Sequence, residues 1–139
     1  MILGLDISTS KIGYSIINKD NKLITCSFKK FKPLALEDRA ELFYTFLLEI
    51  KKKYKIEEIF IEEPFSMFGG GRTTAGTMAK LQRFNGMCSF AVRRVFNQNP
   101  TLISANKARK LVGLKIKRGE DTKKKVIEWL QEHPPSAHY

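Results

Sequence analysis

The chain has 139 residues with 25 Lys and Arg against 14 Asp and Glu, which gives a formal net charge of +11 at pH 7. This length fits one domain over residues 1–139, and a hydrophobic content of 42% is enough to build a core, which argues against a disordered basic tail. No apolar stretch approaches the ~20 residues of a membrane span. The N-terminal segment reads as a strand, not as a signal peptide. Two cysteines fit neither a metal spacing nor a disulfide framework, which favours a reducing cytosol.

The positive charge is concentrated in the second half of the chain. No Asp or Glu occurs from Pro64 to Gly119, whereas eleven Lys and Arg do. Such a run predicts one functional face, and a polyanion is its natural partner because each neutralised phosphate releases counterions. A solvated basic surface that serves only solubility is the alternative. Anionic lipid fits less well, because no segment joins this charge to a clean amphipathic helix.

The apolar pattern predicts a mixed α/β domain in the order βββαβαβαα. Short connections between the first three strands indicate antiparallel hairpins, and a fourth strand that follows a helix indicates a parallel crossover. The expected strands span residues 2–8, 12–18, 23–28, 58–62 and 102–104. The expected helices span residues 36–53, 74–96 and 106–112, with a last helix from about 121 to 132.

Acidic residues lie in two of the apolar strands, where a charge needs a partner. Asp6 in ILGLDIS either binds a cation or caps the turn that follows, and the strand alone leaves both readings open. Glu62 and Glu63 end the strand in IFIEEPF, and only one of them can face the same side as Asp6. If the two strands are neighbours, that glutamate converges with Asp6. Oxygen ligands in a basic protein favour Mg²⁺ or Mn²⁺ and phosphodiester chemistry.

The order of these motifs resembles RuvC-type Holliday-junction resolvases of the RNase H-like superfamily. ILGLDISTSKIGYSII resembles their first hairpin, with Gly13 seven residues after Asp6, and IFIEEPF resembles their fourth-strand motif. AKLQRFNGMCSFAV resembles their central helix, and KLVGLKIKRGEDTKKKVIEWL their basic loop and last helix. The likeness covers nearly the whole chain and looks closer to phage-type members. It implies a mixed five-stranded sheet, three antiparallel strands then two parallel ones, flanked by helices.

The resemblance also implies roles for individual residues. Asp6 and Glu62 match the family's two N-terminal metal ligands, Phe65 matches an aromatic that contacts unstacked bases, and Lys123 matches a basic active-site position. Phe68 is a nearby substitute for Phe65. Further DNA contacts are expected at Arg72, Lys107, Arg109, Lys110, Lys115, Lys117, Arg118, Lys123 and Lys124.

The C-terminus departs from the family pattern. The family completes its metal site with two acidic positions on a C-terminal helix, and this chain has no acid after Glu132. Some relatives carry His at the first of these positions, so His138 is expected as a metal ligand, with a solvated terminal His as the alternative. The expectation is a C-terminally truncated sequence that also lacks the family's last helix, with a protein that uses an incomplete site as the alternative. A truncated 139-residue form is expected to cleave poorly or not at all.

The expected function is a metal-dependent endodeoxyribonuclease that resolves four-way DNA junctions, with two Mg²⁺ ions per site and Mn²⁺ as a substitute. Two symmetric cuts imply a homodimer joined through residues 73–96. The expected setting is the cytoplasm, that of the host cell if the protein is phage-encoded, with no membrane and no nucleotide cofactor. Two alternatives stay open: a non-catalytic junction-binding module, and an ATP-binding protein of the actin-like and sugar-kinase group, whose two lobes do not fit in 139 residues.

Overall fold

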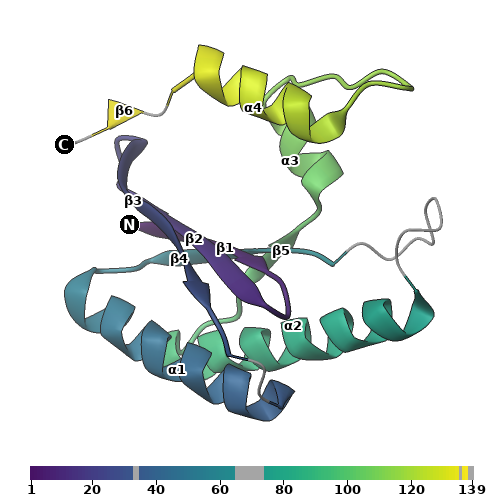
Figure 1. Ribbon diagram of the computed structural model, residues 1–139. Coiled ribbons are helices and arrows are strands. Elements are labelled where there is room, and N and C mark those ends of the chain that lie inside the picture. Colours follow the sequence, from purple (N-terminus) through teal and green to yellow (C-terminus); the bar gives the residue numbers. More distant parts are fainter. Residues whose placement is uncertain (33–34, 65–73, 135, 138–139) are drawn as a thin grey trace.

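The computed structural model describes residues 1–32, 35–64, 74–134 and 136–137, which form six strands and four helices (Figure 1). The strands are β1 (Ile2–Ile7), β2 (Lys11–Ile17), β3 (Lys22–Lys30), β4 (Glu58–Glu62), β5 (Thr101–Ile103) and β6 (Ser136–Ala137). The helices are α1 (Leu36–Lys53), α2 (Ala75–Phe96), α3 (Ala105–Leu111) and α4 (Thr122–Glu132). All strands belong to one sheet in the order β5-β4-β1-β2-β3-β6.

Strand pairing confirms the expected mixed sheet. β1, β2 and β3 pair antiparallel, whereas β4 pairs parallel with β1 and with β5. The sixth strand was not expected from the sequence. It consists of two residues that pair parallel with β3 through Lys22↔Ser136 and Leu23↔Ala137, and a strand this short carries no readable alternation of apolar residues.

The two faces of the sheet have different surroundings. Helices α1 and α2 lie against one face, and α3 and α4 lie on the opposite side (Figure 1). Alternate strand residues point toward α1 and α2 and make the core. The buried strand residues are Leu3, Leu5, Ile7, Ile12, Ile16, Ile59 and Ile61, and the helices meet them with residues that include Phe43, Leu47, Phe84, Cys88 and Val92. We call the other side the open face, because α3 and α4 contribute no buried residue.

The helix ends follow local capping rules. The Thr74 side chain accepts a hydrogen bond from the Thr77 N–H at the start of α2, and Asp121 does the same for the Lys124 N–H at the start of α4. Helix α2 ends at Asn97, which adopts the left-handed conformation with φ of 55°. Of Thr73 and Thr74, which the sequence leaves as alternative caps, the structure shows Thr74 in this role, and the last helix begins near Asp121 as expected.

The acid-free run does not form one face, so that expectation is wrong. Its first helix, α2, packs beside α1 under the sheet, whereas α3 and the loop after it lie on the other side (Figure 1). Arg83 of α2 forms an ion pair with Glu37 of α1 at 2.5 Å, far from the open face. The charges counted along the sequence do not show that, within this run, the chain passes through β5 from one side of the sheet to the other. Among the described residues, no helix is long and apolar enough to cross a membrane.

Replacement of Phe43 tests the core between α1 and the sheet. Phe43 is fully buried and lies tilted against Phe46, so Phe43→Ala should lower the free energy of unfolding by about 3–5 kcal/mol. Its neighbour Leu42 is 43% exposed, and Leu42→Ala should change it by less than about 1 kcal/mol. Urea denaturation followed by circular dichroism measures both values. Equal losses in the two variants would contradict the packing described here.

Candidate active site

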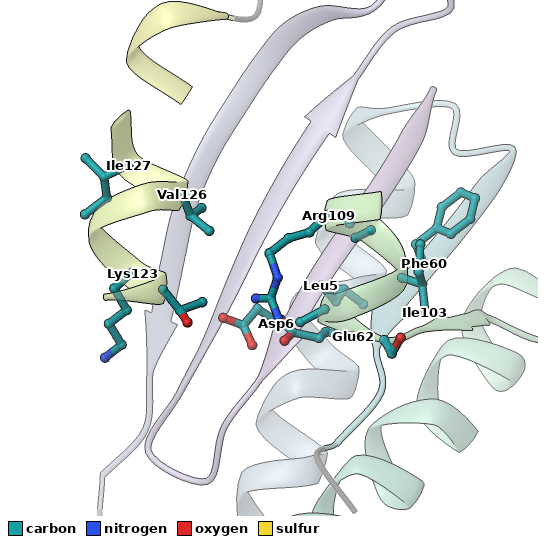
Figure 2. A pocket seen from close by; sticks show the side chains of 14 residues that line it. Leu5, Asp6, Phe60, Glu62, Ile103, Arg109, Lys123, Val126 and Ile127 are labelled. Carbon is teal, nitrogen blue, oxygen red and sulfur yellow. The ribbon is translucent and has the colours of Figure 1, made fainter. Parts of the chain in front are cut away.

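The parallel pairing of β1 with β4 brings Asp6 and Glu62 together on the open face. The register runs Gly4↔Phe60 and Leu5↔Ile61, so one further step places Asp6 beside Glu62. Both carboxyl groups point into the same space in Figure 2. Glu63, the next residue, follows the last residue of β4 and is not among the residues that line this space. The alternation expected from the sequence therefore selects Glu62.

The surroundings of Glu62, Asp6 among them, change its pKa. The pKa of Glu62 is raised from its ordinary value of 4.5, first because its carboxyl group is partly withdrawn from water, and then because of the charge of Asp6 and a hydrogen bond with its carboxyl. The positive charge of Arg109 acts in the opposite direction. Two like charges this close favour either a shared proton or a bound cation.

The residues of this pair fit a magnesium ion. Mg²⁺ is commonly held by one or two carboxylates, with water in its remaining positions. Asp6 and Glu62 supply two such groups, and the part of the chain that the structure describes contains no cluster of three or more His, Cys, Asp or Glu. His138, the third expected ligand, lies outside the described residues.

A hollow of about 780 Å³ extends from the carboxyl pair toward α3 and α4 (Figure 2). Its charged end holds Asp6, Glu62 and Arg109. Its opposite wall is apolar and includes Val126 and Ile127 of α4. Helix α4 faces the sheet across this hollow without a buried residue of its own, and Ile127 is 55% exposed. The hollow combines a polar floor with walls that leave room for a large ligand.

Two of the expected basic residues line this hollow. Arg109 extends from α3 toward Asp6 and Glu62 (Figure 2). Its guanidinium donates to the side-chain oxygen of Asn106, one turn earlier on α3, which fixes its direction. Lys123, at the start of α4, also lines the hollow, but its side chain extends away from the carboxyl pair (Figure 2). Of the two cations, Arg109 is the one that faces the acids.

The other expected contacts lie around this centre or beyond the described residues. Lys110 and Lys115 line a neighbouring hollow of about 470 Å³ between α3 and the loop after it. The Lys117 N–H donates to the Glu120 carboxylate at 3.0 Å. The expected contacts exposed on α3, the loop and α4 are Lys107, Lys110, Lys115, Lys117, Arg118 and Lys124. Phe65, Phe68 and Arg72 lie outside the described residues.

A buried asparagine that was not expected from the sequence supports the site. Asn85 of α2 is 5% exposed, and its side-chain amide donates to the Glu62 carbonyl at 3.4 Å. Asn85 shares the helix stripe of Phe84, Cys88 and Val92, which all face the core. A polar residue in such a stripe needs a partner, and this mismatch was the available signal.

Comparisons with known proteins show which proteins this chain resembles. No protein-family model matches it. Over 98 residues it is 32% identical to the crossover junction endodeoxyribonuclease RuvC of Aliarcobacter butzleri (strain RM4018), covering 68% of this chain and 60% of the relative. The structure of Thermus thermophilus RuvC matches with a TM-score of 0.65 at 14% identity, covering 94% of this chain and 78% of that one. The chain shares the fold of RuvC.

Two further structures agree with this RuvC-type fold. T. thermophilus RuvC in complex with Holliday junction substrate matches with a TM-score of 0.64 at 14% identity, over 81% of this chain and 69% of that one. The yeast mitochondrial Holliday junction resolvase Ydc2 matches with a TM-score of 0.54 at 13% identity, over 98% and 64%. The chain spans about 60% of the length of the curated relative that it matches.

The raised pKa of Glu62 predicts a pH-dependent stability of this chain. Because the pKa of Glu62 is raised in the folded state, this group increases the free energy of unfolding below pH 4.5. That contribution is lost as pH rises through the pKa of Glu62 in the folded protein. Glu62→Gln keeps a neutral group, so in EDTA it should be more stable than wild type at neutral pH, and the gain should shrink toward about pH 4. Urea denaturation across this range measures it. Glu63→Gln is the matched control, and a gain for Glu62→Gln that grows as pH falls would contradict the assignment.

Proposed function

We propose that this chain is the nuclease core of a divalent-metal-dependent endonuclease that cleaves four-way DNA junctions. The observation that carries the proposal is the convergence of Asp6 and Glu62 on the open face, at the same positions of β1 and β4 that the RuvC-type resemblance assigns to metal ligands. The sequence relative is named a crossover junction endodeoxyribonuclease, and one structural match was determined with a Holliday junction. We propose that this chain acts in the cytoplasm.

The proposed chemistry divides between the metal ligands and the surrounding cations. Asp6 and Glu62 would hold two Mg²⁺ ions, or Mn²⁺ in their place, together with ligands from elsewhere, such as His138. Bound there, these ions would activate a water molecule and stabilise the leaving oxygen of the phosphodiester. Asn85 would keep Glu62 in position through its carbonyl. Arg109 would place positive charge on the phosphate that lies over the two carboxylates.

The remaining basic residues would bind the DNA backbone. The proposed phosphate contacts are Arg72, Lys107, Lys110, Lys115, Lys117, Arg118, Lys123 and Lys124, with Phe65 against an unpaired base. Contacts of this kind position the duplex without reading its sequence. Lys123 would serve catalysis only after its side chain turns from the direction in Figure 2 toward the carboxyl pair.

A non-catalytic junction-binding module is the second candidate function. It is favoured by the metal site, where the described residues supply two carboxylates and no third ligand. Both candidates predict binding of branched DNA, and only the first predicts cleavage. A cleavage assay therefore separates them.

Replacement of the carboxylates should separate cutting from binding. With Mg²⁺ and a fluorescent four-way junction, Asp6→Asn and Glu62→Gln should each lower the cleavage rate at least about a hundredfold, because each removes one of the two carboxylates that would hold the metal. Junction affinity, measured by gel shift in EDTA, should stay within about threefold. Glu63→Gln is the matched control and should cut nearly as wild type does.

Three results would revise this proposal. Undiminished cleavage by Asp6→Asn would refute the metal assignment. A larger loss in Glu63→Gln than in Glu62→Gln would move the role to Glu63. Wild type that binds junctions but never cuts them would favour the binding module.

We also propose a two-fold homodimer joined through α2, since junction resolution needs two cuts. Phe90 on α2 is 65% exposed, in contrast to the buried Phe84, and it borders a hollow of about 440 Å³ that includes Tyr44 and Met87. A two-fold axis here would insert each Phe90 into the partner's hollow. Phe90→Glu should convert a dimer to a monomer in sedimentation equilibrium, whereas Leu42→Glu should not. A wild type that is monomeric at about 50 μM would refute this assembly.

A further inference from the structure

The open face carries a second cluster of residues suited to nucleic acid. It is centred on β3, two strands away from Asp6 on β1. Phe28 of β3 is 55% exposed, and the Nζ atoms of Lys11 and Lys30 lie 5.6 and 5.7 Å from the centre of its ring. We call these three residues the Phe28 patch. An exposed ring offers a surface for a base, and the two ammonium groups offer charge to the adjoining phosphates.

Strand register connects the Phe28 patch to the candidate active site. Asp6 pairs with Gly13 across β1 and β2, and Gly13 pairs with Phe28 across β2 and β3, so all three lie in one row on the open face. A shallow hollow of about 310 Å³ includes Asp6, Lys11, Gly13 and Phe28 in its lining. With strands about 4.8 Å apart, Phe28 lies roughly 10 Å from Asp6. A DNA strand with a phosphate at Asp6 would reach the ring with a nearby nucleotide.

The floor between Asp6 and Phe28 is low. Gly13 has no side chain, and a Cβ atom there would stand 3.7 Å from the Cβ of Asp6. Ser27, the small residue before Phe28 on β3, also lines the hollow. The chain of a ligand can therefore lie close to the sheet along this row.

The turn that carries Lys11 is held in place by hydrogen bonds. The Ser8 hydroxyl donates to the Lys11 carbonyl at 2.6 Å, and the Lys11 N–H donates to the Ser8 hydroxyl at 3.2 Å. From outside the turn, Arg39 of α1 donates to the Thr9 carbonyl at 2.6 Å, and the Phe31 N–H donates to the Ser10 carbonyl at 3.0 Å. A fixed turn reduces the entropy lost on binding.

We infer that the Phe28 patch holds an unpaired nucleotide of the DNA strand whose phosphate lies at Asp6. The inference rests on the proposed function and extends it to the far side of the carboxyl pair. The base or sugar packs on the Phe28 ring, and Lys11 and Lys30 neutralise the phosphates beside it. No acidic side chain among the described residues forms an ion pair with either lysine, so both charges are available to DNA.

Binding to a four-way junction tests the ring. In EDTA, where no cutting occurs, Phe28→Ala should weaken affinity about tenfold and Phe28→Trp should retain it, because one stacked base is lost or kept. Phe28→Leu, which keeps apolar volume without the ring, should behave like the Ala variant. Leu42→Ala, an exposed residue of α1 behind the sheet, is the control and should bind as wild type does.

Salt dependence tests the lysines. Lys11→Gln and Lys30→Gln should each lower the slope of log K against log salt by about 1, as expected for the loss of one phosphate contact. Lys52→Gln on α1 removes the same charge away from the open face and should leave the slope unchanged. Unchanged slopes in both patch variants would overturn the inference.

A fluorescent reporter tests the class of partner. In a Trp129→Phe background, the Trp of Phe28→Trp should be quenched by a single-stranded oligonucleotide and not by polyglutamate. Quenching by polyglutamate alone would assign the patch to an acidic protein segment and overturn the inference.

The outcomes separate this inference from the proposed function. A wild type that cuts junctions, together with wild-type affinity in Phe28→Ala, refutes the patch and leaves the nuclease proposal intact. Weak binding by Phe28→Ala together with normal binding by Asp6→Asn supports the patch. A wild type that binds no branched DNA refutes both.

Discussion

The parallel pairing of β1 with β4 is the constraint on which the site depends. Its register is held by burial, because Leu5 and Ile61 must both face α1 and α2, and a slip by one residue would expose them. The start of the pairing is also fixed, since the Met1 ammonium donates to the Lys55 carbonyl at 2.9 Å and the Glu57 N–H donates to the Met1 carbonyl at 2.8 Å. The hydrophobic pattern therefore decides that Glu62, and not Glu63, stands beside Asp6.

Each face of the sheet has its own task. The face under α1 and α2 contains the buried side chains and supplies the stability. The open face carries the acids, Arg109 and Phe28, and its helices α3 and α4 bury nothing completely. Polar and charged groups are costly to bury but suit a surface that meets a charged ligand. The packed layer of α1 and α2 on one side thus supplies the stability that allows Asp6 and Glu62 to lie close together on the other.

The sequence predicted the elements that repeat a local pattern. Alternating apolar residues located the strands, and helical spacing located α1 and α2, because burial on one face imposes these periods. The pairing of Asp6 with Glu62 was within reach because parallel neighbours align their carboxyl ends. Properties that depend on how distant segments meet could not be predicted from the sequence. The basic run is divided between two sides of the sheet at β5. Only the geometry of α3 shows that Arg109, and not Lys107 or Lys110, faces Asp6 and Glu62. Asn85 was recognisable only as a polar residue within the apolar stripe of α2, and Phe28, a single residue in a strand, gives no periodic signal.

The crossover from β1 to β4 also has a consequence for synthesis of the chain. The hairpins of β1, β2 and β3, with Asp6, Lys11 and Phe28, form from contacts near in sequence. Glu62 joins them only after α1 has emerged and packed, since nonlocal contacts form late. On the ribosome, the nascent chain would thus form the hairpins with Lys11 and Phe28 before Glu62 comes to lie beside Asp6. The order of translation would keep the two carboxylates apart until the sheet is assembled.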